Sequence, residues 1–372
     1  MKEKILIITN LYPLPWQPTR AMFNFQQFSY LEDRAEIFYL IPVAFPDWWK
    51  HRKEIQNQKP NIKYVPYIYT PKFGRRYYAK LMRWSINLMA NSWIKKFSPT
   101  KILASWAYPD AVAAIGIAKK FNADFYLKVH GSDINIHATF PERAKQITAM
   151  ANQAKGILSV SQDLANKMVA IDINKEKIRV IYNGVNLIKF VPKPTDIDSP
   201  YIVFIGNLKH DKGVIELLNA FIQIHDSYPK LRLKYIGKGV MLNKLQSITN
   251  QHQLQNKVIF EGTKPHDQLP EIIAKASLLA LPSYNEGVPN VVLEAMACAT
   301  PVVATMVGGI PEVMTRDTGI LAKEITAESI ASCLQKALNK NWDHNAIRAH
   351  AEFFNWTKNT NELASLLNIK EG

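Results

Sequence analysis

Short apolar runs alternate with amphipathic stretches along the first half of the chain. A short, continuous apolar run is typical of a strand buried on both faces of a parallel sheet, whereas apolar positions at helical spacing predict a helix. Their alternation predicts βαβ units. The predicted strands of this half are Ile5–Ile8, Ile37–Ile41, Ile102–Ala104, Phe125–Val129, Gly156–Val160 and Ile178–Ile181.

A proline-rich segment interrupts this alternation at Val191–Pro200, which reads VPKPTDIDSP and has the composition of a linker. Beyond it the alternation resumes. The predicted strands of the second half are Tyr201–Ile205, Leu231–Ile236, Val258–Phe260, Leu278–Leu281 and Val302–Ala304.

The pattern therefore predicts an α/β protein with two doubly wound, Rossmann-like parallel-sheet domains. We place the N-terminal domain at 1–190, the linker at 191–200 and the C-terminal domain at 201–350. Such sheets bind ligands at the carboxyl ends of their strands, so two facing domains would place a cleft between those ends. Residues 351–372 are expected to form a C-terminal helix that either packs on the second domain or returns to the first.

Length and composition fit this architecture. A chain of 372 residues is too long for one ordinary core. Its two cysteines, Cys298 and Cys333, form no metal-ligand spacing and no disulfide framework, which favours a reducing cytoplasm. The apolar run Ile5–Ile8 is too short for a signal peptide, and no run approaches the roughly 18 apolar residues of a membrane span.

The net charge of +15 is distributed unevenly. Residues 1–190 contain 28 Lys and Arg against 13 Asp and Glu, whereas the remainder contains 18 of each kind. Aromatic residues accompany the cations in Trp48–Lys53 and Lys72–Lys96. This combination suits an anionic membrane surface. We therefore expect a cytoplasmic protein bound peripherally to the inner face of the plasma membrane. A solvated basic face with its aromatic residues in the core is the alternative.

The segment Pro282–Glu312 contains the most informative chemistry. A predicted strand ends at Leu281, a polar turn follows, and a helix is expected to begin near Asn290. From Gly287 to Pro311 the only charged residue is Glu294, which lies among apolar and small residues. A buried carboxylate needs hydrogen-bond donors, and the vicinal hydroxyls of a ribose would supply them. A neighbouring backbone group or a lysine would serve equally.

The start of this helix suits a diphosphate, because its N–H groups are unpaired and its dipole is positive there. Glu286 sits just before the turn, eight positions before Glu294. This spacing would direct one carboxylate towards a sugar and the other towards a nucleoside, with phosphates between them.

The segment EGVPNVVLEAMA contains two glutamates separated by seven residues and is followed by PVVAT and GGIPE. This pattern resembles the retaining glycosyltransferases of family 4, which have the GT-B fold, and the resemblance extends along nearly the whole chain. HGSD at His130–Asp133, NGVN at Asn183–Asn186 and GNLKHDKG at Gly206–Gly213 match further motifs in order. YPLPWQPTRAMFNFQ and AYPDAVAA more specifically resemble a branch that makes exopolysaccharides and teichuronic acids.

The resemblance implies that the N-terminal domain binds the acceptor and the C-terminal domain binds the nucleotide-sugar. It implies catalytic roles for three residues: Glu286 contacts hydroxyls of the transferred sugar, Lys212 neutralises the leaving diphosphate, and His130 approaches the donor sugar. Glu294 would hold the ribose hydroxyls. The other implied donor-binding positions are Gly287, Val288, Pro289, Asn290, Val291, Gly206, Asn207, Lys209, Gly262 and Thr263.

Two departures from the family pattern affect phosphate binding. Asn207 stands where the family has an arginine, so either Lys209 or Lys212 would have to supply more of the positive charge or the affinity for the donor would fall. Ala21 stands where a glycine would let the backbone approach phosphate. Either Arg20 would compensate on the acceptor or phosphate side, or the contact with the donor would be lost there. Asp133 is a further candidate on that side and, alternatively, a helix cap.

Two other motifs do not change this interpretation. Asp196 and Asp198 have the carboxylate spacing of a metal-dependent transferase but lie in the linker, so we expect no metal. Gly237 and Gly239 lack the third glycine of a dinucleotide-binding loop, which excludes an NAD enzyme.

The sequence thus predicts a retaining, metal-independent hexosyltransferase without a cofactor. It would move a hexose or N-acetylhexosamine from a nucleotide-diphosphate sugar, UDP more than GDP, to a glycan acceptor, polyprenyl-linked or an oligosaccharide, in cell-surface polysaccharide synthesis. A UDP-sugar epimerase of the same fold is the alternative. A basic nucleic-acid-binding protein is the third reading, and no nucleic-acid-binding motif supports it.

Overall fold

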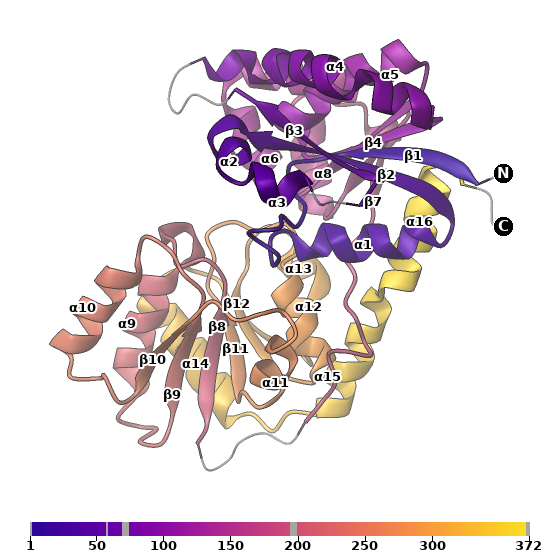
Figure 1. The fold of residues 1–372 in the computed structure, drawn as a ribbon. Coiled ribbons are helices and arrows are strands. Elements are labelled where there is room, and N and C mark those ends of the chain that lie inside the picture. The colour runs from indigo at the N-terminus through magenta and orange to yellow at the C-terminus, as the bar shows by residue number, and fades with distance from the viewer. Residues whose placement is uncertain (1, 57–58, 69–73, 194–198, 370–372) are drawn as a thin grey trace. The chain divides into compact units, whose positions relative to one another are not determined.

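The computed structural model describes residues 2–56, 59–68, 74–193 and 199–369, which form two compact units (Figure 1). Unit 1 comprises Met1–Tyr182 and Trp356–Gly372, and unit 2 comprises Asn183–Asn355. Each unit is a parallel sheet with helices packed on it, which confirms the predicted fold class. The linker residues Asp196 and Asp198 lie outside the described residues.

Unit 1 contains a seven-stranded sheet with the order β3-β2-β1-β4-β5-β6-β7. Every neighbouring pair is parallel. The central strands are almost wholly buried because their sequences are nearly continuous apolar runs. The strands are β1 (Glu3–Ile8), β2 (Ala35–Ala44), β3 (Ile62–Tyr67), β4 (Lys101–Ser105), β5 (Asp124–Val129), β6 (Gly156–Ser159) and β7 (Ile178–Val180).

Helices cover both faces of this sheet, with α4 and α5 on one face and α1 and α16 on the other (Figure 1). The helices of unit 1 are α1 (Met22–Glu32), α2 (Phe45–Lys50), α3 (Arg52–Gln56), α4 (Tyr78–Phe97), α5 (Val112–Phe121), α6 (Ser132–Asn135), α7 (Pro141–Ala151), α8 (Gln162–Val169) and α16 (Trp356–Leu366). No helix in the described ranges combines the length and the apolar character needed to cross a membrane.

Unit 2 contains a six-stranded parallel sheet with the order β10-β9-β8-β11-β12-β13. Its strands are β8 (Tyr201–Ile205), β9 (Arg232–Ile236), β10 (Val258–Gly262), β11 (Leu278–Leu281), β12 (Val302–Thr305) and β13 (Gly319–Ala322). Its helices are α9 (Val214–Ile224), α10 (Leu242–Gln251), α11 (Leu269–Ala274), α12 (Asn290–Ala297), α13 (Ile310–Val313), α14 (Ala327–Asn339) and α15 (His344–Ala351).

Two edge strands, β3 and β13, are absent from the sequence prediction. The sequence of β3, IKYVPY, contains a proline, which is tolerated there because an edge strand leaves one row of N–H groups outside the ladder. The sequence of β13, GILA, is short and begins with glycine. Lys63 and Pro66 interrupt the apolar positions of β3, and the apolar run of β13 is only three residues long.

The boundary between the units lies at Tyr182, eight residues before the predicted end of the first domain. The segment after it belongs to unit 2 because Arg348 of α15 donates to the carbonyl oxygens of Leu187 (2.9 Å) and Phe190 (2.6 Å). The chain then re-enters unit 1 at Trp356, where α16 packs on α1. The sequence analysis left two placements open for the C-terminal helix, packing on the second domain or return to the first. Helix α16 returns to unit 1, whereas the preceding helix α15 belongs to unit 2.

Candidate functional site

The loop between β11 and α12 is the centre of the site in unit 2. It leaves the sheet after Leu281 and enters α12 at Asn290, as predicted. Asn183 holds the entry of the helix by donating from Nδ2 to the Val288 carbonyl (3.2 Å) and to Asn290 Oδ1 (2.9 Å). The loop therefore delivers Gly287, Val288, Pro289, Asn290 and Val291 to the positive end of an eight-residue helix.

Two of the predicted catalytic residues meet at this loop. Lys212 Nζ lies 2.6 Å from Glu286 Oε1, and Ser283 Oγ donates to the same oxygen at 2.7 Å. Both charged side chains retain some exposure, 23% for Lys212 and 13% for Glu286. A cation and an anion are thus held together where solvent and ligands can still reach them.

Glycines allow the two loops to approach this closely. Gly213, directly after Lys212, has φ +63°, and a Cβ there would lie 1.9 Å from the Pro282 carbonyl oxygen. Gly308 has φ +55°, and its Cβ would lie 1.9 Å from the Glu286 carbonyl oxygen. Side chains are strongly disfavoured at both positions, so these glycines bring Lys212 and the 305–309 turn against the Glu286 loop.

Glu294 is buried in α12, with 10% of its side chain exposed. Its Oε1 lies 3.0 Å from His266 Nε2. The partner is therefore a histidine on the loop after β10, and neither of the donors considered from sequence, a backbone group or a lysine. Sequence reasoning missed His266. The available signal was its position just beyond a strand, at the sheet edge where ligands bind.

The remaining predicted donor positions also follow strands of unit 2. Gly206, Asn207 and Lys209 follow β8, and Gly262 and Thr263 lie at the end of β10. Because the sheet is parallel, all these strand ends lie at one edge, together with the end of β11. A Cβ on Gly237 would lie 1.9 Å from the Gly206 carbonyl oxygen, so this glycine serves backbone packing. In the described ranges no three His, Cys, Asp or Glu residues are grouped to hold a metal ion.

In unit 1, His130 follows β5 and is partly exposed. Its Nε2 lies 2.7 Å from Ser105 Oγ, and Ser105 Oγ donates to Asn24 Oδ1 at 3.2 Å. Because the hydroxyl hydrogen is used on Asn24, the serine oxygen accepts from His130 Nε2–H. Burial and the nearby Lys128 lower the pKa of His130 well below its usual value, so the ring is neutral and presents Nδ1 as an acceptor.

Lys128 is a buried cation that the sequence analysis did not single out, although it interrupts the apolar run FYLKV. Its Nζ donates to Asn24 Oδ1 (2.9 Å) and Gln27 Oε1 (2.6 Å). Gln27 in turn donates to Asn359 of α16 at 2.6 Å. Burial lowers the pKa of Lys128 to about 7. This network joins the edge that holds His130 to the returning helix.

Asp133 is fully buried, and both carboxylate oxygens accept backbone N–H groups. Oδ1 accepts from His130 (3.0 Å) and Gly131 (2.8 Å), and Oδ2 accepts from Ala107 (3.1 Å). Burial raises the pKa of Asp133. The side chain shapes the His130 loop from inside, and the N-cap position of α6 is taken by Gly131. The helix-cap alternative is therefore wrong, and the acceptor-side role of Asp133 stays a prediction.

Arg20 lines a cavity of ≈ 300 Å³ in unit 1 together with Asn10, Asp47 and Tyr67. No hydrogen bond or ion pair joins its guanidinium to another described residue, and burial lowers its pKa. Apolar side chains complete a wall of mixed character, as in sites that bind sugars or other polar organic ligands. The neighbouring Ala21 has φ +47°, so the backbone keeps a glycine-like conformation without a glycine.

The basic and aromatic segment around α4 divides between core and surface. Tyr78 is buried and Trp93 packs against the core, as the alternative reading expected. Trp84 and Leu88, by contrast, are 61% and 68% exposed. The exposed cations of this surface, which we call the α4 face, are Arg75, Arg76, Lys80, Arg83, Lys95 and Lys96. Lys72 lies outside the described residues.

Comparisons with known proteins extend over nearly the whole chain. Residues 41–189 match the family described as "Glycosyltransferase Family 4", and residues 188–352 match "Glycosyl transferases group 1". TuaC of Bacillus subtilis (strain 168), a glycosyltransferase assigned to teichuronic acid biosynthesis, is 27% identical over 363 residues, which cover 90% of this chain and 88% of TuaC.

Two solved structures have similar folds. Sucrose-phosphate synthase from Thermosynechococcus elongatus superposes with a TM-score of 0.80 at 18% identity, covering 99% of this chain and 98% of that chain. The Anabaena protein HepE, solved in complex with UDP and glucose, gives a TM-score of 0.74 at 19% identity, covering 98% and 99% respectively. Both likenesses confirm the fold expected from the sequence.

Proposed function

Because the chain belongs to glycosyltransferase family 4 and has the GT-B fold, we propose that unit 2 binds a nucleotide-diphosphate sugar whose glycosyl group the enzyme transfers to a glycan acceptor. The observation that carries this proposal is the Lys212–Glu286 pair beside the start of α12. A cation that suits a diphosphate, a carboxylate that suits sugar hydroxyls and a helix N-terminus thus lie at one edge of the sheet.

Each part of the nucleotide-sugar has a complementary partner among the residues of this site. Lys212 and the start of α12 supply positive charge for the leaving diphosphate, so the proposed reaction needs no metal ion. Glu294 would accept ribose hydroxyls, and Glu286 would accept hydroxyls of the transferred hexose or N-acetylhexosamine. We propose retention of configuration because the two glutamates and Lys212 stand at the positions of the retaining family. We propose UDP rather than GDP as the nucleotide of the donor, because the similar structure of HepE was solved with UDP and glucose.

In the first testable prediction, Glu294→Ala weakens UDP binding at least about tenfold, because a hydrogen bond to a charged group is worth about 1.5–3 kcal/mol. Isothermal titration calorimetry of the full chain measures the effect. Glu324→Ala, which removes an exposed carboxylate of unit 2, is the matched control and should bind UDP as the wild type does. A folded Glu294→Ala protein with unchanged affinity for both UDP and GDP would contradict the ribose contact.

We assign the acceptor to unit 1. The Arg20 cavity offers a cation that forms no hydrogen bond or ion pair with the described residues, beside polar groups that could bind hydroxyls, so it suits a phosphate or sugar of the acceptor. The neutral His130 lies at the carboxyl end of β5 and offers a hydrogen-bond acceptor to a hydroxyl. The relative TuaC supports a role in cell-surface polysaccharide synthesis, where a polyprenyl-linked acceptor would be presented at the cytoplasmic leaflet.

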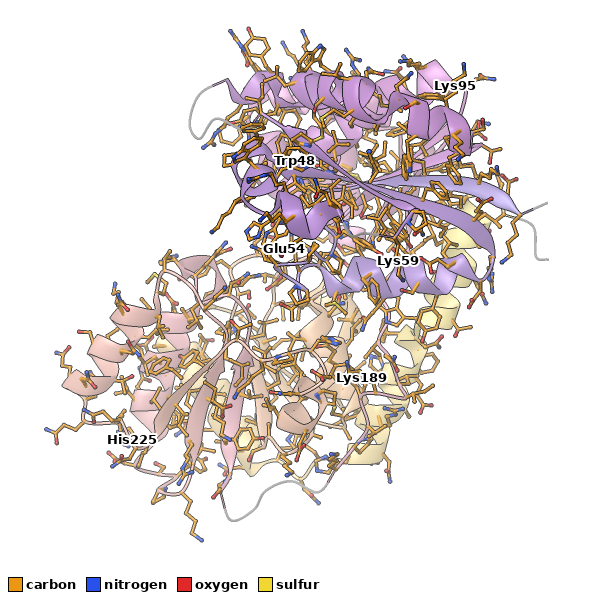
Figure 2. All side chains as sticks on the ribbon, in the orientation of Figure 1. Trp48, Glu54, Lys59, Lys95, Lys189 and His225 are labelled. Atoms are coloured by element: carbon orange, nitrogen blue, oxygen red, sulfur yellow. The ribbon has the colours of Figure 1, made fainter. Side chains whose placement is uncertain are left out.

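The α4 face is the proposed membrane contact. The sequence of α4 contains no Asp or Glu, and its exposed Trp84 and Leu88 are accompanied by exposed cations. Figure 2 labels Lys95 near the C-terminal end of this helix. Each cation near an anionic surface contributes about 1 kcal/mol, so several together with an indole would hold the protein reversibly.

We therefore expect co-sedimentation with phosphatidylglycerol vesicles at low salt and release as salt screens the attraction. Reversing the charges of Arg75, Arg76, Lys80 and Arg83 should abolish it. The matched control reverses four exposed cations of unit 2, Lys230, Arg232, Lys244 and Lys336, and changes the net charge equally. If both variants lose vesicle binding equally, net charge alone drives the binding. If the variant with Arg75, Arg76, Lys80 and Arg83 reversed still binds vesicles, the α4 face is not the membrane contact.

A further inference from the structure

His266 occupies a position between a cation and an anion in unit 2. Its Nδ1 lies 3.1 Å from Lys189 Nζ, and its Nε2 lies 3.0 Å from Glu294 Oε1. The imidazole is largely buried, with 14% of its side chain exposed, and it forms a T-shaped contact with the Phe190 ring, the ring centroids lying 5.4 Å apart. One ring thus joins the segment before the linker to the buried carboxylate of α12.

The chemistry of the two partners determines which nitrogen of His266 carries the hydrogen. A lysine ammonium only donates, so His266 Nδ1 must accept. The hydrogen is then on Nε2, which donates to Glu294. Without Lys189 the other tautomer would be available, and its unprotonated Nε2 would face the carboxylate with no hydrogen to share.

Arg348 holds Lys189 in this position. Its guanidinium bridges three carbonyl oxygens, those of Leu187 (2.9 Å) and Phe190 (2.6 Å) on the Lys189 segment and that of Ala297 (2.6 Å) at the end of α12. Figure 2 labels Lys189 on this segment. The segment and the helix that carries Glu294 are therefore tied together, and the relay from Lys189 to Glu294 has little freedom.

We propose that Lys189 and His266 are positioning residues that orient Glu294 for the ribose. The bond from His266 occupies Oε1 and leaves Oε2, to which the described residues donate no hydrogen bond, for a ribose hydroxyl. The relay also stabilises the buried charge before the nucleotide arrives, since an uncompensated carboxylate would be costly there. This inference rests on the proposed function, because it assumes that Glu294 contacts the ribose.

The test compares two ligands that differ only at the ribose. UDP and 2′,3′-dideoxy-UDP are titrated by calorimetry against the full-length wild type and its variants, or GDP and its dideoxy analogue should the wild type prefer guanine. His266→Phe should weaken UDP binding about five- to tenfold, which corresponds to one hydrogen bond at the ribose, and leave dideoxy-UDP binding unchanged. Lys189→Met should produce a smaller loss with the same ligand selectivity.

Two further variants separate positioning from structure. His266→Gln keeps an N–H donor at the place of Nε2 and should restore most of the selectivity for UDP over dideoxy-UDP. His252→Phe, at the exposed end of α10, is the matched control and should behave as the wild type does. Because Lys189→Met leaves the ring in place, it keeps the proposal testable if His266→Phe does not fold.

The outcomes distinguish this inference from the proposed function. If Glu294→Ala loses ribose selectivity but His266→Phe and Lys189→Met keep it, the relay is overturned and the ribose contact stands. If His266→Phe weakens UDP and dideoxy-UDP equally, His266 is only structural. If Glu294→Ala shows no ribose selectivity, the ribose contact fails and the relay fails with it.

Discussion

Replacing Lys212 with alanine should lower turnover about 100-fold and change the KM for the nucleotide-sugar much less. Departure of a nucleoside diphosphate concentrates negative charge in the transition state, and removing one preorganised donor at such a charge typically costs about 10²–10³ in turnover. Lys212 Nζ lies 2.6 Å from Glu286 Oε1, so the cation is held beside the start of α12.

Steady-state kinetics with a UDP-sugar measure this effect. Lys244→Ala, an exposed lysine on α10, is the matched control and should keep wild-type turnover. The wild type should also retain its turnover in EDTA, because Lys212 and the helix N-terminus are proposed to neutralise the diphosphate. A Lys212→Ala enzyme with normal turnover and only a raised KM would show that the lysine binds ground and transition states equally. Loss of turnover in EDTA, restored by Mg²⁺ or Mn²⁺, would contradict the metal-independent reaction.

The wild-type protein should gain about 2 kcal/mol of unfolding free energy between pH 7 and pH 9 through Lys128. Burial lowers the pKa of this lysine in the folded protein to about 7, well below its ordinary value of 10.5. In this window the unfolded chain binds more protons than the folded one, so stability rises with pH. The contribution is complete above the unfolded pKa and is lost as pH falls through the folded pKa.

Urea unfolding at several pH values, followed by circular dichroism, measures this slope. Lys128→Met should lack the part of the pH dependence that Lys128 contributes to the unfolding free energy. Subtracting the pH dependence of the variant from that of the wild type cancels the contributions of titratable groups common to both proteins. The carboxyl of Asp110 titrates in the opposite sense below this window, because burial raises its pKa to about 7. Identical slopes in the two proteins between pH 7 and pH 9 would show that Lys128 is charged in the folded state with its ordinary pKa.

The sequence alone determined the class of fold and singled out the loop and helix that contain Glu286 and Glu294. Strands buried on both faces must be continuously apolar, so the central strands of both sheets could be found from the pattern, whereas β3 and β13 at the edges could not. Glu294 stood out because it is the only charge in a long run of apolar and small residues. The beginning of α12 followed from the turn residues and the proline that precede it.

The tertiary structure alone decided which polar side chains meet. Glu294 is paired with His266, 28 positions away, and Glu286 with Lys212, 74 positions away. Lys128 reaches Asn24 and Gln27 across more than 100 positions. A buried polar group requires a partner but places no limit on the sequence distance to it. The partners depend on the order of the strands and on the return of α16 to unit 1, and no local pattern in the chain encodes either of these.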